Sequence, residues 1–95
     1  MLERVIEAYL VKRVKDMGGI AYKFTSPSRR SVPDRIVVLK DKHIFLVEVK
    51  STVGKLTEGQ EREIGKLRDL GQRVFVCNSK EQVDQLLYDV TGVSK

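Results

Sequence analysis

Apolar residues recur at steps of three and four in three parts of the chain, and this is the spacing of one face of an α-helix. The spacing predicts helices over residues 2–17, over residues 57–70 and after Ser79. Gly18-Gly19 follows the first helix, and glycine accepts the left-handed conformation that is common just beyond a helix end. Thr57 and Gln60 have the spacing of a capping box, which favours a helix start at Thr57.

Short runs of β-branched and apolar residues lie between these helices, over residues 20–24, 34–39, 44–50 and 73–77, and predict four strands. The first three follow one another through short connections and should be antiparallel. A helix separates the third strand from the fourth, so that pair should be parallel. The sequence therefore predicts an α/β fold in the order α-β-β-β-α-β-α, with a four-stranded mixed sheet flanked by helices. The side chains expected to be buried include Tyr22 and Phe24 of the first strand and the stripe of Ile64, Leu67 and Leu70 on the second helix.

Length and composition limit the possible classes of protein. The chain has 95 residues, of which 41% are apolar and 33% charged, and this predicts one folded domain over residues 1–95. No apolar run approaches the roughly 20 residues that cross a bilayer, and the first residues lack the apolar block of a signal peptide. The single cysteine, Cys77, favours a reducing cytoplasm. The net charge of +5 indicates a polyanionic partner only weakly, because many basic domains bind none.

Three charged residues lie in or beside apolar strands. Asp34 begins the second strand, and Glu48 and Lys50 share one face of the third. If these strands form a hairpin, Asp34 and Glu48 become neighbours across the ladder. Adjacent carboxylates repel unless a cation lies between them, and Mg²⁺ takes carboxylate oxygens as ligands. Such an ion could activate a water for phosphodiester hydrolysis, with Lys50 offsetting negative charge in the transition state.

Simpler interpretations compete with this one. In isolation, a Glu-x-Lys pattern in a strand is most often an ordinary salt bridge, here between Lys50 and Glu48 or Asp34. Glu7 lies on a largely apolar flank of the first helix, where an acid commonly marks the border of the buried face. Glu3 lies one turn earlier on the same face, so either acid can be the one that reaches a site.

The combined motifs resemble a known family. Val32-Pro33-Asp34-Arg35 and Val47-Glu48-Val49-Lys50 are similar to the Pro-Asp … Glu-x-Lys signature of the PD-(D/E)XK nucleases, whose restriction-endonuclease-like core has the order αβββαβ. Further residues follow the order found in the stand-alone VRR-NUC domains of phages and bacteria: Glu7, Gly18-Gly19, Lys23 and Gln60. The resemblance covers residues from about 3 to 89. It departs at Ser31, where that family usually has glycine.

The resemblance implies a catalytic set made of Glu7, Asp34, Glu48, Lys50 and Gln60. Asp34, Glu48 and the Val49 carbonyl would bind Mg²⁺ or Mn²⁺ directly. Glu7 would reach the metal through water, Lys50 would position the attacking water, and Gln60 would lie near the site. The implied activity is that of a metal-dependent, structure-selective DNA endonuclease acting on Holliday-junction-like or other branched DNA, in the cytosol of a bacterium or a phage-infected cell.

Basic residues flank the proposed site and are predicted to contact DNA phosphates: Lys23, Arg29, Arg30, Arg35 and Lys55. Solvated loop charge is an equally good interpretation of Arg29-Arg30 alone. Because so short a chain cannot wrap a long duplex, a homodimer with two sites is expected. The alternative function is a non-catalytic nucleic-acid-binding module on the same fold.

Overall fold

Three helices and four strands follow the predicted order αβββαβα. They are α1 (Glu3–Asp16), β1 (Ile20–Lys23), β2 (Arg35–Leu39), β3 (His43–Val49), α2 (Glu58–Asp69), β4 (Val74–Cys77) and α3 (Lys80–Thr91). The structure, a computed structural model, describes residues 1–93, so the last two residues of the predicted domain lie outside the described residues. Each predicted boundary lies within one residue of the observed one, which confirms the hydrophobic periodicity as the main signal.

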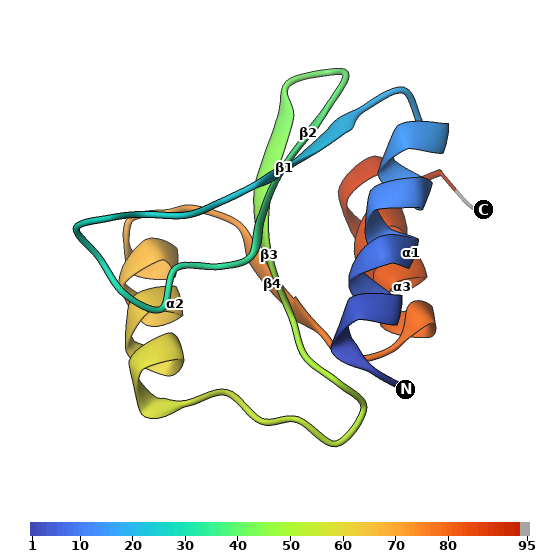
Figure 1. Cartoon of the computed structure of the whole chain (residues 1–95). Helices are drawn as coiled ribbons and strands as arrows, with labels where there is room; N and C mark the ends of the chain where they lie inside the picture. Colours follow the sequence, from blue (N-terminus) through green and yellow to red (C-terminus); the bar gives the residue numbers. More distant parts are fainter. Residues whose placement is uncertain (94–95) are drawn as a thin grey trace.

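The four strands form one mixed sheet in the order β1-β2-β3-β4. β2 pairs antiparallel with β1 and β3, and β4 pairs parallel with β3, as predicted. In Figure 1 the sheet is seen nearly edge-on, with α1 and α3 on one side and α2 on the other. Arg35 pairs with Val47, so the ladder places Asp34 beside Glu48 at the start of β2 and the end of β3.

The core lies between the sheet and the α1–α3 pair. Its fully buried side chains come from alternate positions of the central strands and from one stripe of each helix: Ile6, Leu10, Val14, Val37, Val47, Val49, Val83 and Leu87. Alternation along a strand places every second side chain on this face. Within residues 1–93, no helix has both the length and the apolar character to cross a membrane.

The prediction that Tyr22 and Leu70 face the core is wrong. Tyr22 is 53% exposed and Leu70 is 73% exposed, whereas Phe24 and Leu67 are half-buried. Tyr22 pairs with Ile36 on the sheet face away from α1 and α3, and α2 packs on β4 at the opposite edge of the sheet. A cavity of about 620 Å³ lies between α2 and the segment after β1, and Leu70 lines it and stays exposed.

Candidate active site

Asp34 is held at the entrance to β2 by both its main chain and its side chain. Pro33, which is fully buried, precedes it, and its ring restricts the backbone at this point. The Asp34 carbonyl accepts a hydrogen bond from Phe24 N at 2.9 Å, which extends the β1–β2 ladder. Its Oδ2 accepts a hydrogen bond from Val49 N at 2.8 Å, so the carboxylate lies directly against the end of β3.

Glu48 and Lys50 extend from the end of β3 on the same side as Asp34. Glu48 is 2% exposed, and its Oε2 lies 3.6 Å from Lys50 Nζ. The Lys50 main-chain N–H donates to Cys77 O at 2.9 Å, so the parallel ladder fixes this residue just beyond the strand. The ordinary salt bridge that the Glu-x-Lys pattern allows is therefore present between Lys50 and Glu48. Its carboxylate is buried, however, and lies next to the second carboxylate, that of Asp34.

Gln60 connects α2 to this cluster. Its side-chain Nε2 donates to Glu48 Oε2 at 3.1 Å, while its Oε1 accepts from Thr57 N at 3.0 Å. Thr57 Oγ1 accepts from Gln60 N at 3.1 Å, which completes the predicted capping box. One side chain thus fixes the start of α2 and orients the Glu48 carboxylate.

Burial and mutual repulsion disfavour the ionised form of both acids. Burial, followed by the charge of Asp34, raises the pKa of Glu48 to about 7. Burial also raises the pKa of Asp34, although the hydrogen bond from Val49 N–H acts in the opposite direction. Without a further cation, the two side chains are therefore costly to ionise together.

The donor set fits a hard divalent cation. Glu48 Oε1 is buried and has no hydrogen-bond partner in the described part of the chain, and such an atom is costly unless something satisfies it. Mg²⁺ commonly takes one or two carboxylates, keeps several waters and accepts carbonyl oxygens, and Mn²⁺ favours the same ligands. Over residues 1–93, no three or more His, Cys, Asp or Glu side chains are grouped as ligands. Asp34 and Glu48 could thus hold an ion whose remaining positions are open to water and substrate.

The predicted helical acid, Glu7, is already paired. Its Oε2 accepts from Arg35 Nε at 2.7 Å, and Arg35 Nη1 donates to the Ala21 carbonyl at 3.0 Å. The charge of Glu7 raises the pKa of Asp34, and that of Glu3 raises the pKa of Glu48. Both helical acids therefore act electrostatically on the cluster, and the choice between them stays open.

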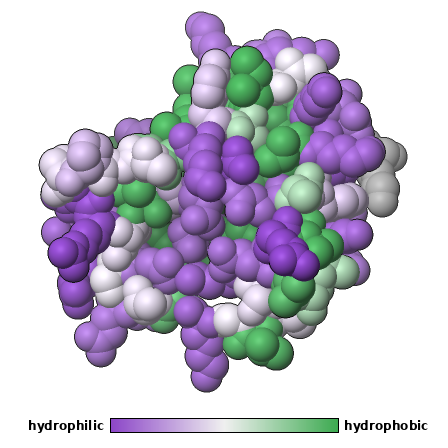
Figure 2. All heavy atoms as spheres, viewed as in Figure 1, coloured by the Kyte–Doolittle hydropathy of each residue, from purple (hydrophilic) through white to green (hydrophobic). Residues whose placement is uncertain are grey.

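The five basic residues predicted to contact DNA fall into two groups. Arg29 and Arg35 form ion pairs, with Glu63 and Glu7 respectively. Three others are exposed and form no ion pair within the described residues: Lys23, Arg30 and Lys55. Hydrophilic side chains also cover the middle of the face between α2 and α1 (Figure 2).

Glu63 was not among the predicted site residues. It lies three positions after Gln60 on α2, is 9% exposed, and binds Arg29 through both carboxylate oxygens. Residues three apart share a helix face, so the sequence could have predicted that Glu63 lies next to Gln60. Its partner, 34 residues away in the chain, was not.

Ser31, at the departure from the family pattern, has a backbone φ of 65°. Glycine adopts this left-handed conformation without the steric cost that a Cβ atom brings. We expect Ser31→Gly to raise the free energy of unfolding by about 0.5–1 kcal/mol, as measured by urea denaturation. Ser31→Ala keeps the Cβ atom and serves as the control. An equal gain in Ser31→Ala would show that backbone strain is not the cause.

Comparisons with known proteins identify the family and the fold of this chain. Residues 8–81 match the family model described as "VRR-NUC domain". "Putative nuclease p44" of Acyrthosiphon pisum secondary endosymbiont phage 1 is 48% identical over 79 residues, covering 83% of this chain and 85% of that protein. A solved structure described as "VRR_NUC domain" superimposes with a TM-score of 0.83 and 34% identity, over 90% of this chain and 92% of that one. The chain therefore belongs to the VRR-NUC domain family.

Proposed function

We propose that this nuclease domain is a metal-dependent endonuclease that hydrolyses phosphodiester bonds in branched DNA. The observation that carries the proposal is the buried Glu48 carboxylate, with one unpartnered oxygen, beside Asp34 and Lys50. An ordinary salt bridge needs only one acid, and it leaves the repulsion between the two carboxylates unexplained. Membership of the VRR-NUC family and the name of the phage relative support a nuclease.

In this proposal Asp34, Glu48 and the Val49 carbonyl hold Mg²⁺ or Mn²⁺. When bound, the ion would polarise a phosphoryl oxygen and lower the pKa of an attacking water. Lys50 offsets the negative charge that develops on the phosphate, because β3 and the Glu48 carboxylate hold its ammonium at the site. Gln60 keeps Glu48 oriented through its 3.1 Å hydrogen bond. Glu7 acts on the cluster through its charge while it remains paired with Arg35.

Branched DNA and a homodimer are the finer parts of the proposal. The molecule measures 33 × 30 × 21 Å, so one copy spans about one turn of duplex, roughly 34 Å. Two copies related by a two-fold axis would present two sites to a Holliday-junction-like substrate. Lys23, Arg30 and Lys55 are exposed cations available to hold phosphates. The phage origin of the relative supports action in the cytosol of a bacterium or an infected cell.

The deciding experiment incubates the purified protein with labelled four-way junction, flap and linear duplex of the same sequence. Each substrate is tested with Mg²⁺, Mn²⁺ or EDTA. We expect cleavage with either metal and none in EDTA, faster on the junction or flap than on the duplex. Paired symmetric cuts and a light-scattering mass of two chains are expected together, because both follow from a dimer.

Several outcomes would contradict parts of this proposal. DNA binding without cleavage under any metal would favour a non-catalytic binding module. Cleavage in EDTA would contradict the proposed dependence on a metal ion. Equal cleavage rates on duplex and junction would contradict the preference for branched DNA. A light-scattering mass of one chain would contradict the homodimer.

A further inference from the structure

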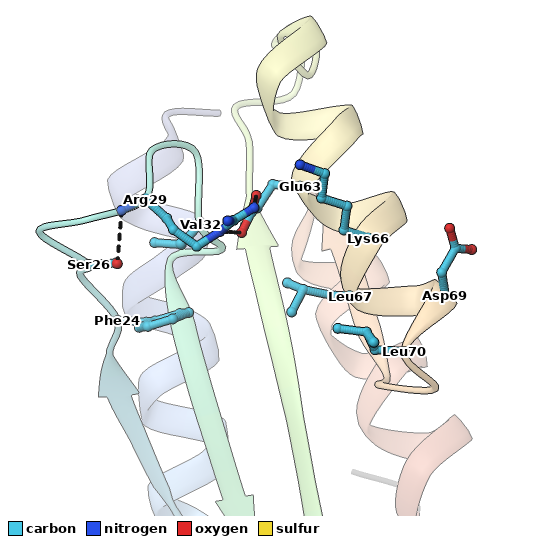
Figure 3. A pocket seen from close by; sticks show the side chains of 9 residues that line it. All are labelled: Phe24, Ser26, Arg29, Val32, Glu63, Lys66, Leu67, Asp69 and Leu70. Atoms are coloured by element: carbon cyan, nitrogen blue, oxygen red, sulfur yellow. Dashed lines mark hydrogen bonds and ion pairs between the residues drawn. The ribbon is translucent and has the colours of Figure 1, made fainter.

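An ion pair ties the segment after β1 to the helix on the other side of the cavity. Arg29 Nε donates to Glu63 Oε2 at 2.9 Å and Arg29 Nη2 donates to Glu63 Oε1 at 2.7 Å. The two parallel bonds form the fork geometry that makes arginine–carboxylate pairs directional. Figure 3 shows the Arg29 side chain reaching from the loop across to Glu63 on α2. The Glu63 side chain is 11% exposed, and the Arg29 hydrogen bonds lower its pKa.

A cavity leaves part of the loop without apolar packing against α2. The cavity of about 620 Å³ lies between the loop and α2, with Phe24, Val32 and Leu67 on its walls (Figure 3). Within the loop, Arg29 N donates to Ser26 Oγ at 3.2 Å, which shapes a local turn. Ser31 of the loop also lies against Gly59 of α2, where an added Cβ atom would come within 2.9 Å of Ser31 Oγ. The Arg29–Glu63 pair adds a charged, directional contact between the loop and the helix.

The two elements joined by this pair carry the two sides of the candidate active site. The loop leads through Pro33 into Asp34, whose carboxylate accepts from Val49 N. Glu63 lies one helical turn after Gln60, which donates to Glu48. Hydrogen bonds from Phe24 N and Val49 N also hold Asp34, so movement of the loop relative to α2 would act on Asp34 by loosening these two bonds.

The neighbouring arginine has a different environment. Arg30 is exposed, and its guanidinium forms no ion pair within residues 1–93. A phosphate could bind Arg30 without breaking an existing contact. A phosphate that took Arg29 would leave the buried Glu63 carboxylate without its partner, which is unfavourable.

We propose that Arg29 and Glu63 form a positioning ion pair that fixes the loop leading into Asp34 against α2, and that Arg30 makes the phosphate contact of this loop. The proposal rests on the proposed nuclease function and divides two adjacent arginines between two roles. It assigns Glu63 to the organisation of the site, although Glu63 does not touch the reacting atoms.

Arg29→Lys tests the positioning role, because it keeps the charge and loses the fork. We expect the cleavage rate at saturating DNA to fall about 10–100-fold, as for other supporting contacts around metal sites. The DNA dissociation constant and its dependence on salt should stay unchanged. Glu63→Gln should behave alike. The matched control is Arg62→Lys, which alters an exposed pair with Glu58 on the same helix and should leave the rate unchanged.

Arg30→Ala tests the second half of the proposal. Loss of one phosphate contact should weaken DNA binding and reduce the slope of log K against log salt by about 0.9. The opposite pattern would overturn the proposal. In that pattern Arg29→Ala reduces the slope, Arg29→Lys retains the full rate, and Arg30→Ala has no effect on binding.

Amide hydrogen exchange separates this proposal from the proposed function, because it needs no substrate. The amides to follow are those of Phe24 and Val49, because both donate to Asp34 at the base of the loop. Arg29→Lys and Glu63→Gln should each speed their exchange by about tenfold or more, since a local opening that is easier by 1.4 kcal/mol exchanges tenfold faster. Arg62→Lys should not. If wild-type protein cleaves nothing, the nuclease proposal fails while this measurement still decides the positioning role. Unchanged exchange in both variants would overturn it.

Discussion

Asp34→Asn and Lys50→Met are expected to lower the cleavage rate by about 10²–10³-fold or more, since each removes charge from the reacting centre. Asparagine keeps the shape of Asp34 and can still accept the hydrogen bond from Val49 N. Methionine keeps most of the apolar stem of Lys50 while removing the ammonium that lies 3.6 Å from Glu48. Both variants should therefore fold and bind DNA, and the lost rate should come from the chemistry.

The two variants should fail in different ways. Loss of a metal ligand should raise the Mg²⁺ concentration that gives half the maximal rate, so Asp34→Asn should respond partly to excess metal. Loss of the ammonium should lower the maximal rate without this change. Rates measured against Mg²⁺ concentration separate the two. Asp69→Asn and Lys15→Met make the same chemical changes at exposed positions and should match wild type. If Asp34→Asn cuts as fast as wild type, Asp34 is not a metal ligand.

The residues of the candidate site could be placed together from sequence because local rules position them. Alternation along β3 places Glu48 and Lys50 on one side, and a short hairpin places Asp34 beside Glu48. The capping box fixed where α2 begins and hence which turn carries Gln60. The family resemblance then indicated that Gln60 approaches the acids, and the 3.1 Å hydrogen bond to Glu48 agrees.

The partners of the arginines could not be predicted in the same way. Arg35 meets Glu7 across 28 residues and Arg29 meets Glu63 across 34 residues. Periodicity shows which way a side chain faces within its element, but the partner depends on how the elements pack. The prediction that Tyr22 is buried was wrong for a related reason. Alternation along the strand assigns its side chain to one face of the sheet, but it could not show that α2 leaves this face uncovered.

Glu48→Gln is expected to stabilise the metal-free protein at the same time as it abolishes cleavage. Burial raises the pKa of Glu48 to about 7 in the folded protein, above the ordinary 4.5 of a solvated glutamate. Below pH 4.5 the side chain is protonated in both folded and unfolded states, so it does not disfavour folding. Between pH 4.5 and 7 the unfolded chain ionises first, and the free energy of unfolding falls as the pH rises. Above pH 7 the full loss, on the order of 1–3 kcal/mol, is present.

Glutamine cannot ionise, and its Oε1 can still accept the hydrogen bond from Gln60. In EDTA at pH 8, urea denaturation should therefore show Glu48→Gln to be more stable than wild type by about 1–3 kcal/mol, and the difference should largely disappear at pH 5. Added Mg²⁺ should stabilise wild type and not the variant, because a bound ligand stabilises only the state that holds it. Glu61→Gln, an exposed acid on α2, should show neither effect. A variant less stable than wild type at pH 8 would show that Lys50 already compensates the buried charge, and the strongest physical reason for a metal at this site would be lost.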